Sequence, residues 1–390
     1  MSTDPNDLLE QLDRHLACAS QAWLFGAGIS KQAGVPLMQP LTDRVRVKAK
    51  DTPHQVVVDA LFSELPAGSH IEHFLSHLGD YATLAERAKA IEVTTVGGTK
   101  IKASALIEAH KAVVEWIADI VRWGYRAATD GQAEIIGEFG KPLVTIDGHK
   151  GFVLALFNTA QAGLQDRRGP TNLFSTNYDT LLEDALALCS ISYWDGFSGG
   201  AIAFRNHHFG EPPPAGYRAH VVKLHGSIDW YAGDEGKAWR IRAEDGYPAR
   251  TGRVLIHPQA TKYTATQRDP FAAQFDLFRR TLSTRSDNVL AVCGYSFGDD
   301  HINQEIEFVM TTADNRTTML VFYFEGAGWA DCLAKWRTSE WGERLYVATE
   351  KGLYRGADGP YHKSPDGKDR DWWTFEGVTK LLKDGAEGYL

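Results

Sequence analysis

The chain has 390 residues, of which 43% are hydrophobic and 23% charged, so it can bury a sizeable core and is longer than one small domain requires. Its 41 lysines and arginines and 50 acidic residues give a net charge of −9, which argues against a dedicated nucleic-acid binder. The four cysteines include no CxxC pair, which excludes a zinc site built from four cysteines.

The ends and the apolar runs of the chain predict its location. The N-terminus is polar and amphipathic, unlike a signal peptide. No apolar run approaches the ~20 residues of a membrane span. We therefore expect a soluble, cytoplasmic protein that does not associate with a membrane.

Seven apolar, β-rich runs predict strands, and helical patterns fall between them. The strands are expected at 22–25, 171–176, 220–226, 253–258, 288–294, 318–324 and 344–349, and helices at about 178–189, 267–285, 300–313 and 329–340. Several strands are apolar without alternation, as in a sheet that is covered on both faces. This order predicts an α/β fold with a Rossmann-like, doubly wound, mostly parallel sheet.

The connection between the first two predicted strands is unusually long. It spans about 145 residues, far more than one crossover requires, and its pattern is mostly helical, with a loop expected at 93–100. We expect a helical insertion at 61–139, within a discontinuous core formed by residues 1–60 and 140–350.

The last segment, residues 351–390, is rich in glycine, aspartate, lysine and aromatic residues. It predicts an irregular surface segment followed by a short terminal helix. We expect Trp372 and Trp373 to pack this extension against the core.

The first strand ends in GAGIS, residues 26–30. Gly26 and Gly28 permit close backbone approach, and a helix can begin after Ser30. A Rossmann GxGxxG would need glycine at the position of Lys31, and the P-loop pattern is absent. A phosphate site and a tight strand-to-helix turn are both consistent with this spacing.

Two further strands end in polar residues. In FSTNYDTLLE (174–183), Asn177 or Asp179 could cap the next helix, but both also stand where α/β sheets place ligands. In KLHG (223–226), His225 follows an apolar strand. A histidine there is more often a structural hydrogen-bond partner, although its usual pKa suits a general base.

The fourth such strand ends in GYSFGDDHI, residues 294–302, with Ser296 at the tip of the turn. Asp299 and Asp300 fit N-terminal positions of a helix, where negative charge is favoured. A metal role for these two aspartates with His301 is the less favoured alternative, and we expect no metal site. Together, the four strand ends predict a ligand crevice at the carboxyl edge of one sheet.

These motifs, in the order GAGIS, AGVP, TNYD, KLHG and GYS, resemble the sirtuin superfamily. FSTNYDTLLE and GYSFGDDHI resemble more closely the sirtuin-like domains of bacterial anti-phage defence proteins. The resemblance covers roughly 20–50 and 170–325 and leaves the helical insertion and the extension unmatched.

The resemblance implies NAD as the ligand and a set of site residues. Asn177 would orient the water or ribose hydroxyl at the reacting carbon, Asp179 would hold the nicotinamide amide, and His225 would act as the base. The remaining NAD-binding residues that it implies are Gly26, Ala27, Gly28, Ser30, Thr176, Gly294 and Ser296, and we add Glu325 as an acceptor for the adenine ribose.

Two departures separate this chain from deacylating sirtuins. It lacks the paired CxxC motifs of their zinc module, and LMQPLTDRV follows Val35-Pro36 where they carry an Asp-Phe-Arg stretch. The resemblance therefore favours an NAD glycohydrolase that binds no zinc. The alternatives are a non-catalytic NAD-binding or assembly module, a deacylase or ADP-ribosyltransferase, and a nuclease.

An enzyme that destroys NAD must be held inactive in its own cell. We therefore expect a homo-oligomer, built through the helical insertion and controlled by a partner protein. The resemblance implies a HerA-type hexameric ATPase as that partner, in anti-phage defence.

Overall fold

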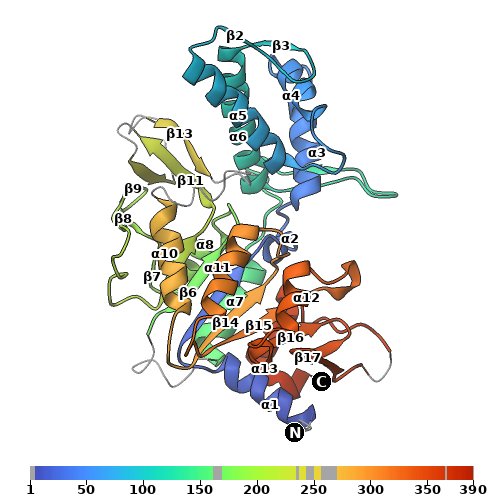
Figure 1. Ribbon diagram of the computed structural model, residues 1–390, viewed down its shortest axis with the longest axis vertical. Helices are drawn as coiled ribbons and strands as arrows, with labels where there is room; N and C mark the ends of the chain where they lie inside the picture. Colours follow the sequence, from blue (N-terminus) through green and yellow to red (C-terminus); the bar gives the residue numbers. More distant parts are fainter. Residues whose placement is uncertain are drawn as a thin grey trace.

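A nine-stranded sheet forms the centre of the computed structural model, which describes residues 5–160, 169–233, 237–242, 250–255, 270–364 and 367–389 (Figure 1). The strand order is β18-β17-β16-β15-β14-β1-β6-β10-β7. The strands are β1 (Gln21–Phe25), β6 (Thr171–Ser175), β7 (Tyr193–Trp194), β10 (Ala219–Lys223), β14 (Asn288–Cys293), β15 (Thr317–Phe322), β16 (Leu345–Thr349), β17 (Gly352–Arg355) and β18 (Asp358–Tyr361).

The central six strands are parallel neighbours in the order β10-β6-β1-β14-β15-β16. Counted along the chain this order is 3-2-1-4-5-6, the order of a doubly wound Rossmann-like sheet. The predicted fold class is therefore confirmed. The direction of winding reverses between β1 and β14, and ligands of such sheets bind outside the carboxyl ends of the strands at that point.

Helices cover both faces of the sheet, which explains why its strands are apolar without alternation. In β1, Trp23 and Phe25 pack with α1, α7, α8 and α13 on one face, whereas Ala22 and Leu24 pack with α10, α11 and α12 on the other. The helices are α1 (Pro5–Leu16), α7 (Asp147–Leu154), α8 (Leu181–Leu188), α10 (Phe271–Leu282), α11 (Asp300–Met310), α12 (Asp331–Arg337) and α13 (Phe375–Tyr389).

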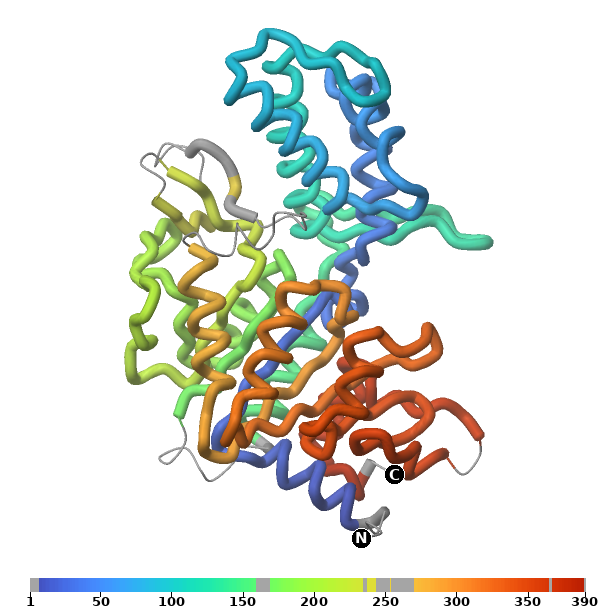
Figure 2. The backbone as a smooth tube through the Cα atoms, viewed as in Figure 1, coloured from blue at the N-terminus to red at the C-terminus, as the bar shows by residue number. Residues whose placement is uncertain are grey.

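The first strand leads through α2 (Gly28–Lys31) into a separate helical unit, which stands above one end of the core in Figure 2, with both termini near the opposite end. It contains α3 (Met38–Ala49), α4 (Gln55–Phe62), α5 (Ile71–Ala88) and α6 (Ala103–Trp123). Its apolar side chains form a hydrophobic cluster that also includes Tyr178, Leu181 and Ile228. Helix α3 and most of α4 lie within residues 1–60, where the sequence placed the main core, but their buried side chains pack against α5 and α6.

Two segments differ from the prediction. Residues 93–100, expected as a loop, include the ends of a hairpin of β2 (Glu92–Thr94) and β3 (Lys100–Lys102). The run at 253–258 contributes to β13 (Arg250–Leu255), which pairs antiparallel with β11 (Gly226–Gly233) in a second sheet, and residues 256–258 lie outside the described residues. That second sheet has the order β13-β11-β12-β9-β8, with β8 (Phe197–Gly199), β9 (Ile202–Arg205) and β12 (Ala238–Ile241).

The C-terminal extension is more regular than its composition predicts. After β16, strands β17 and β18 extend the main sheet with antiparallel pairing, and α13 follows with a kink at Gly385. Trp372 is fully buried and its Nε1 donates to the carbonyl of Thr349, while the Trp373 ring lies 4.7 Å from that of Phe324. Both tryptophans therefore pack the extension onto the core.

A buried carboxylate, Glu64, holds the hairpin of the helical unit. It accepts hydrogen bonds from the Gly97 N–H (2.6 Å), the Tyr81 hydroxyl (3.1 Å) and His77 Nε2 (2.8 Å). Burial raises the pKa of Glu64, but the hydrogen bonds from Gly97, Thr95, His77 and Tyr81 outweigh it and lower the pKa to about 2.

In the part of the chain that is described, no helix has both the length and the apolar character needed to cross a bilayer.

Candidate active site

The turns after β1 and β14 pack directly against each other at the point where the winding reverses. The Gly26 N–H donates to the Cys293 carbonyl (3.1 Å), and the Gly28 N–H donates to the Gly294 carbonyl (2.9 Å). A Cβ on Gly26 would lie 2.5 Å from Gly294 O, and one on Gly28 would lie 2.7 Å from Gly294 Cα. The two glycines thus allow the close approach of two turns, and their N–H groups are engaged within the protein.

Ser30 joins this turn to the loop after β6. Its hydroxyl donates to Asp179 Oδ2 (2.8 Å), and it accepts from Asn177 Nδ2 (3.1 Å). All three side chains are buried. Asp179 also accepts through Oδ1 from the N–H of Leu181, the first residue of α8 (3.1 Å). The structure therefore joins three of the predicted site residues, Ser30, Asn177 and Asp179, in one hydrogen-bonded chain.

The direction of these hydrogen bonds fixes the amide of Asn177. A carboxylate only accepts hydrogen bonds, so the one hydroxyl proton of Ser30 is directed at Asp179. Ser30 Oγ must then accept from Asn177, and this places the Nδ2 of the amide on the Ser30 side. Asn177 Oδ1 is buried and accepts no hydrogen bond from any described residue. It is therefore an oriented acceptor for a water or a hydroxyl group.

His225 lies just beyond β10, the strand next to β6, and its ring is buried. Its Nε2 lies 3.0 Å from Nε2 of His301, at the start of α11, with the two rings stacked 5.1 Å apart. Asp299 reaches the same place, since ligand atoms of His225, Asp299 and His301 all lie within 4.8 Å of one another. The sequence did not predict this pairing of His225 with His301.

A buried lysine supports the loop that carries Asn177. Lys223, at the end of β10, is 1% exposed and its ammonium group donates to the Asp179 carbonyl. It also lies 3.8 Å from the carboxylate of Glu183 on α8. Burial raises the pKa of Glu183 to about 7, although Lys223 opposes the shift. Nothing in the spacing of KLHG signalled a structural role for this lysine.

The helical unit contacts the loop after β6, which carries Asn177 and Tyr178. The Tyr178 hydroxyl donates to Glu72 of α5 (3.2 Å), and the Tyr178 carbonyl accepts from the Ile228 N–H of β11 (2.9 Å). Burial, together with the nearby charges of Glu72 and Asp299, raises the pKa of Tyr178 well above its usual value. Tyr178 therefore links the helical unit, the second sheet and the candidate site.

The other predicted site residues are distributed along the carboxyl edge of the sheet. Thr176 donates through its N–H to the Phe25 carbonyl (3.0 Å), Gly294 adopts a φ of 67°, and Ser296 is exposed on the turn after β14. Ala27 is helical and precedes α2. Glu325 lies after β15, where its carboxylate accepts from Thr349 (3.1 Å) and Tyr354 (2.8 Å), so it is held by the extension rather than joined to the Asn177 chain.

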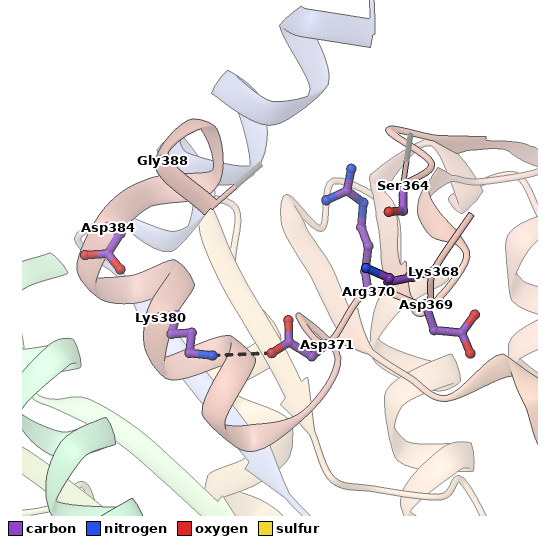
Figure 3. A pocket seen from close by; sticks show the side chains of 8 residues that line it. All are labelled: Ser364, Lys368, Asp369, Arg370, Asp371, Lys380, Asp384 and Gly388. Atoms are coloured by element: carbon purple, nitrogen blue, oxygen red, sulfur yellow. Dashed lines mark hydrogen bonds and ion pairs between the residues drawn. The ribbon is translucent and has the colours of Figure 1, made fainter. Parts of the chain in front are cut away.

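A surface cavity of about 440 Å³ lies elsewhere, on the C-terminal extension (Figure 3). Its walls come from residues 364–388, and the ion pair of Lys380 with Asp371 (3.4 Å) crosses part of it. None of the residues at the strand ends described above lines this cavity.

Comparison with known proteins agrees with part of the sequence prediction. Residues 171–340 match the family model of the SIR2-like domain. Similar solved structures include a mutant Sir2 homologue in complex with ADP-ribose (14% identity, 80% of this chain and 85% of that chain, TM-score 0.34) and a Sir2 homologue in complex with NAD (14% identity, 80% and 82%, TM-score 0.31). No curated protein sequence is significantly similar to the chain.

Proposed function

We propose that this protein is an NAD glycohydrolase, which hydrolyses NAD to nicotinamide and ADP-ribose. The observation that carries the proposal is the oriented, unpaired Oδ1 of Asn177, next to the strand that ends in His225. The match of residues 171–340 to the SIR2-like domain and the sirtuin-like order of motifs favour NAD as the substrate.

The reaction requires few groups from the protein. The bond between ribose C1′ and the nicotinamide nitrogen breaks, and its electron pair neutralises the cationic ring. Because nicotinamide leaves as a neutral molecule, no strong acid is required. A water oxygen then bonds to C1′ and releases one proton.

The residues of the site fit these steps. Asn177 Oδ1 accepts a hydrogen bond from the attacking water or from a ribose hydroxyl. Ser30 and Asp179 hold that amide in orientation. The buried imidazole of His225, whose Nε2 lies 3.0 Å from Nε2 of His301, is the group that would take up the proton that the water releases. Asp179 holds Asn177 through Ser30, and its contact with the nicotinamide amide, which the resemblance implies, stays a prediction.

The test is NAD consumption by the purified full-length protein, with chromatography of the products. We expect nicotinamide and ADP-ribose in equal amounts. His225→Ala should lower kcat by about 10²–10⁴-fold, as for the loss of a general base, and Asn177→Ala should also lower it strongly. His208→Ala, an exposed histidine in the loop after β9, is the matched control and should retain the native rate.

The alternatives give different outcomes. Binding of NAD without nicotinamide release, alone and with a partner, would leave a binding or assembly module. Nicotinamide release only in the presence of an acylated or other acceptor protein would indicate a deacylase or an ADP-ribosyltransferase.

We further propose that the enzyme is cytoplasmic, acts as an NAD-depleting effector in anti-phage defence, and is held in a homo-oligomer controlled by a HerA-type hexameric ATPase. Exposed apolar side chains on the helical unit support an assembly surface, since Val56 is 66% exposed and Ile91 and Val96 are each 88% exposed. Light scattering with and without the ATPase tests this, and a strictly monomeric chain in both settings would refute it.

A further inference from the structure

Two side chains that can ligate a metal, from Asp299 and His301, lie beside the candidate base His225. His225 follows β10, Asp299 immediately precedes α11, and His301 lies in its first turn. Their ligand atoms all lie within 4.8 Å of one another, and the two Nε2 atoms are 3.0 Å apart. Both imidazoles are buried and Asp299 is partly exposed, so the cluster lies at the edge of the protein interior.

The separation of the two nitrogens matches that of two zinc ligands. Zinc binds histidine nitrogen at about 2.0–2.1 Å, so two nitrogens on one tetrahedral ion lie about 3.3 Å apart. An ion would therefore have to separate the two rings by only a few tenths of an ångström. Two imidazoles and one carboxylate favour a first-row divalent cation over Mg²⁺ or Ca²⁺, which prefer oxygen ligands.

The turn that presents Asp299 and His301 is fixed by its own hydrogen bonds. The Tyr295 hydroxyl lies 3.2 Å from both the Asp299 carbonyl and Asn303 Oδ1. Asn303 Nδ2 donates to the Phe297 carbonyl (2.7 Å), at a residue with a φ of 61°. Two of the ligands are thus held on a rigid turn, as a metal site requires.

We propose that His225, Asp299 and His301 bind one zinc-type divalent cation, with a fourth position left for a solvent molecule, and that the ion inhibits the hydrolysis of NAD. A nitrogen lone pair that binds the ion cannot also accept a proton, so the bound ion withdraws His225 from its role as the base. The sequence offered Asp299, Asp300 and His301 as a less favoured metal site, and the proposed site has His225 in place of Asp300. The proposal therefore differs from our expectation that the protein binds no metal. The inhibition rests on the proposed function, whereas the binding does not.

Co²⁺ binding to the chelator-treated full-length protein tests the site directly, because the visible absorption of Co²⁺ reports its coordination. We expect one tetrahedral Co²⁺ per chain, displaced by Zn²⁺. His301→Ala and the conservative Asp299→Asn should each weaken binding at least about tenfold, since even the residues that only orient metal ligands contribute that much. His208→Ala, which removes an exposed histidine, should bind like the native chain.

Equal Co²⁺ spectra and affinities in the native, Asp299→Asn and His301→Ala proteins would overturn the site. Melting temperatures identify a variant that fails to fold, and Asp299→Asn, which keeps the shape of the side chain, is the safer of the two.

Inhibition is tested separately. Zn²⁺ should stop nicotinamide release by the native enzyme, a chelator should restore it, and Asp299→Asn should need at least about tenfold more Zn²⁺ relative to its own zinc-free rate. Metal binding without any NAD hydrolysis by the metal-free protein would refute the glycohydrolase while leaving the site. Metal binding with hydrolysis that Zn²⁺ leaves unchanged would overturn the inhibition.

Discussion

Replacing Gly26 by alanine tests whether the turns after β1 and β14 form one packed unit. The new Cβ would lie 2.5 Å from Gly294 O and 2.6 Å from Tyr295 Cα. Both neighbours are backbone atoms, which cannot move aside as the end of a long side chain can. Gly26 does not have a positive φ, so the effect of the substitution is steric.

The magnitude follows from the contacts that must change. Overpacking of a tight site costs about 1–3 kcal/mol. Separating the turns also weakens the hydrogen bonds from Gly26 to Cys293 and from Gly28 to Gly294, at about 1 kcal/mol each. We therefore expect the free energy of unfolding to fall by about 2–4 kcal/mol, together with a loss of NAD affinity.

The assay combines urea unfolding with calorimetric titration of NAD or ADP-ribose. The matched control is Gly298→Ala, in the same turn after β14, where a Cβ would lie 3.4 Å from Ser296 Oγ and contact nothing else within 4 Å. That variant should stay within about 1 kcal/mol of the native protein, since alanine also restricts the unfolded chain. Equal stability and equal nucleotide affinity of the Gly26→Ala and Gly298→Ala proteins would refute the packing argument.

Three further substitutions test the network around the site and the helical unit. Ser30→Ala frees the amide of Asn177 to rotate, so kcat for NAD should fall on the order of 10²-fold with a smaller change in KM; unchanged steady-state kinetics would contradict this. Glu64→Gln should lower the free energy of unfolding by about 1–3 kcal/mol at pH 7. Because the pKa of Glu64 is lowered from 4.5 to about 2, its stabilisation is complete above pH 4.5 and is lost as the pH falls toward 2, so urea unfolding should show the two proteins converging there. Lys223→Met removes both the cation beside Glu183 and the hydrogen bond to the Asp179 carbonyl. Because the pKa of Glu183 is already raised to about 7, its carboxyl can protonate, so we expect the free energy of unfolding to fall by about 1–3 kcal/mol; an unchanged value would contradict the role of Lys223 in supporting this loop.

Much of the main sheet could be predicted because its strands are buried on both faces. The runs that became β1, β6, β10, β14, β15 and β16 are short and apolar and are bounded by glycine or polar residues, which is enough to place them within a few residues. Their parallel order follows from the helices between them. The run at 253–258 is equally apolar, but nothing within a strand says which partner it will pair with, and β13 belongs to the second sheet.

The hairpins were harder to predict. Residues 92–102 and the strands β17 and β18 contain glycine, lysine and aspartate, which are depleted in strands. They are ordered by tertiary contacts, such as those of Glu64 with Gly97 and the pairing of β17 with β16. Composition alone therefore indicated loops where the folded chain has strands.

The candidate site could be predicted only as a set of strand ends. Since β1, β6 and β10 are parallel neighbours, Ser30, Asn177 and His225 had to emerge at one edge of the sheet. The contact of His225 with His301 joins β10 to a helix that follows β14, across two intervening strands. It depends on the orientation of α11 above the sheet, which no spacing in the sequence encodes.

The engagement of the glycine N–H groups changes how a nucleotide can be recognised at this edge. In dinucleotide-binding Rossmann folds, the first βα turn offers its backbone N–H groups to the pyrophosphate. Here the N–H groups of Gly26 and Gly28 bind carbonyls of the turn after β14, and α2 has only four residues. These two N–H groups are therefore engaged within the protein, whereas the amide of Asn177 is oriented by Ser30. Substitutions that let Asn177 rotate should consequently lower kcat for NAD, whereas substitutions that separate the two turns should lower the affinity for the nucleotide.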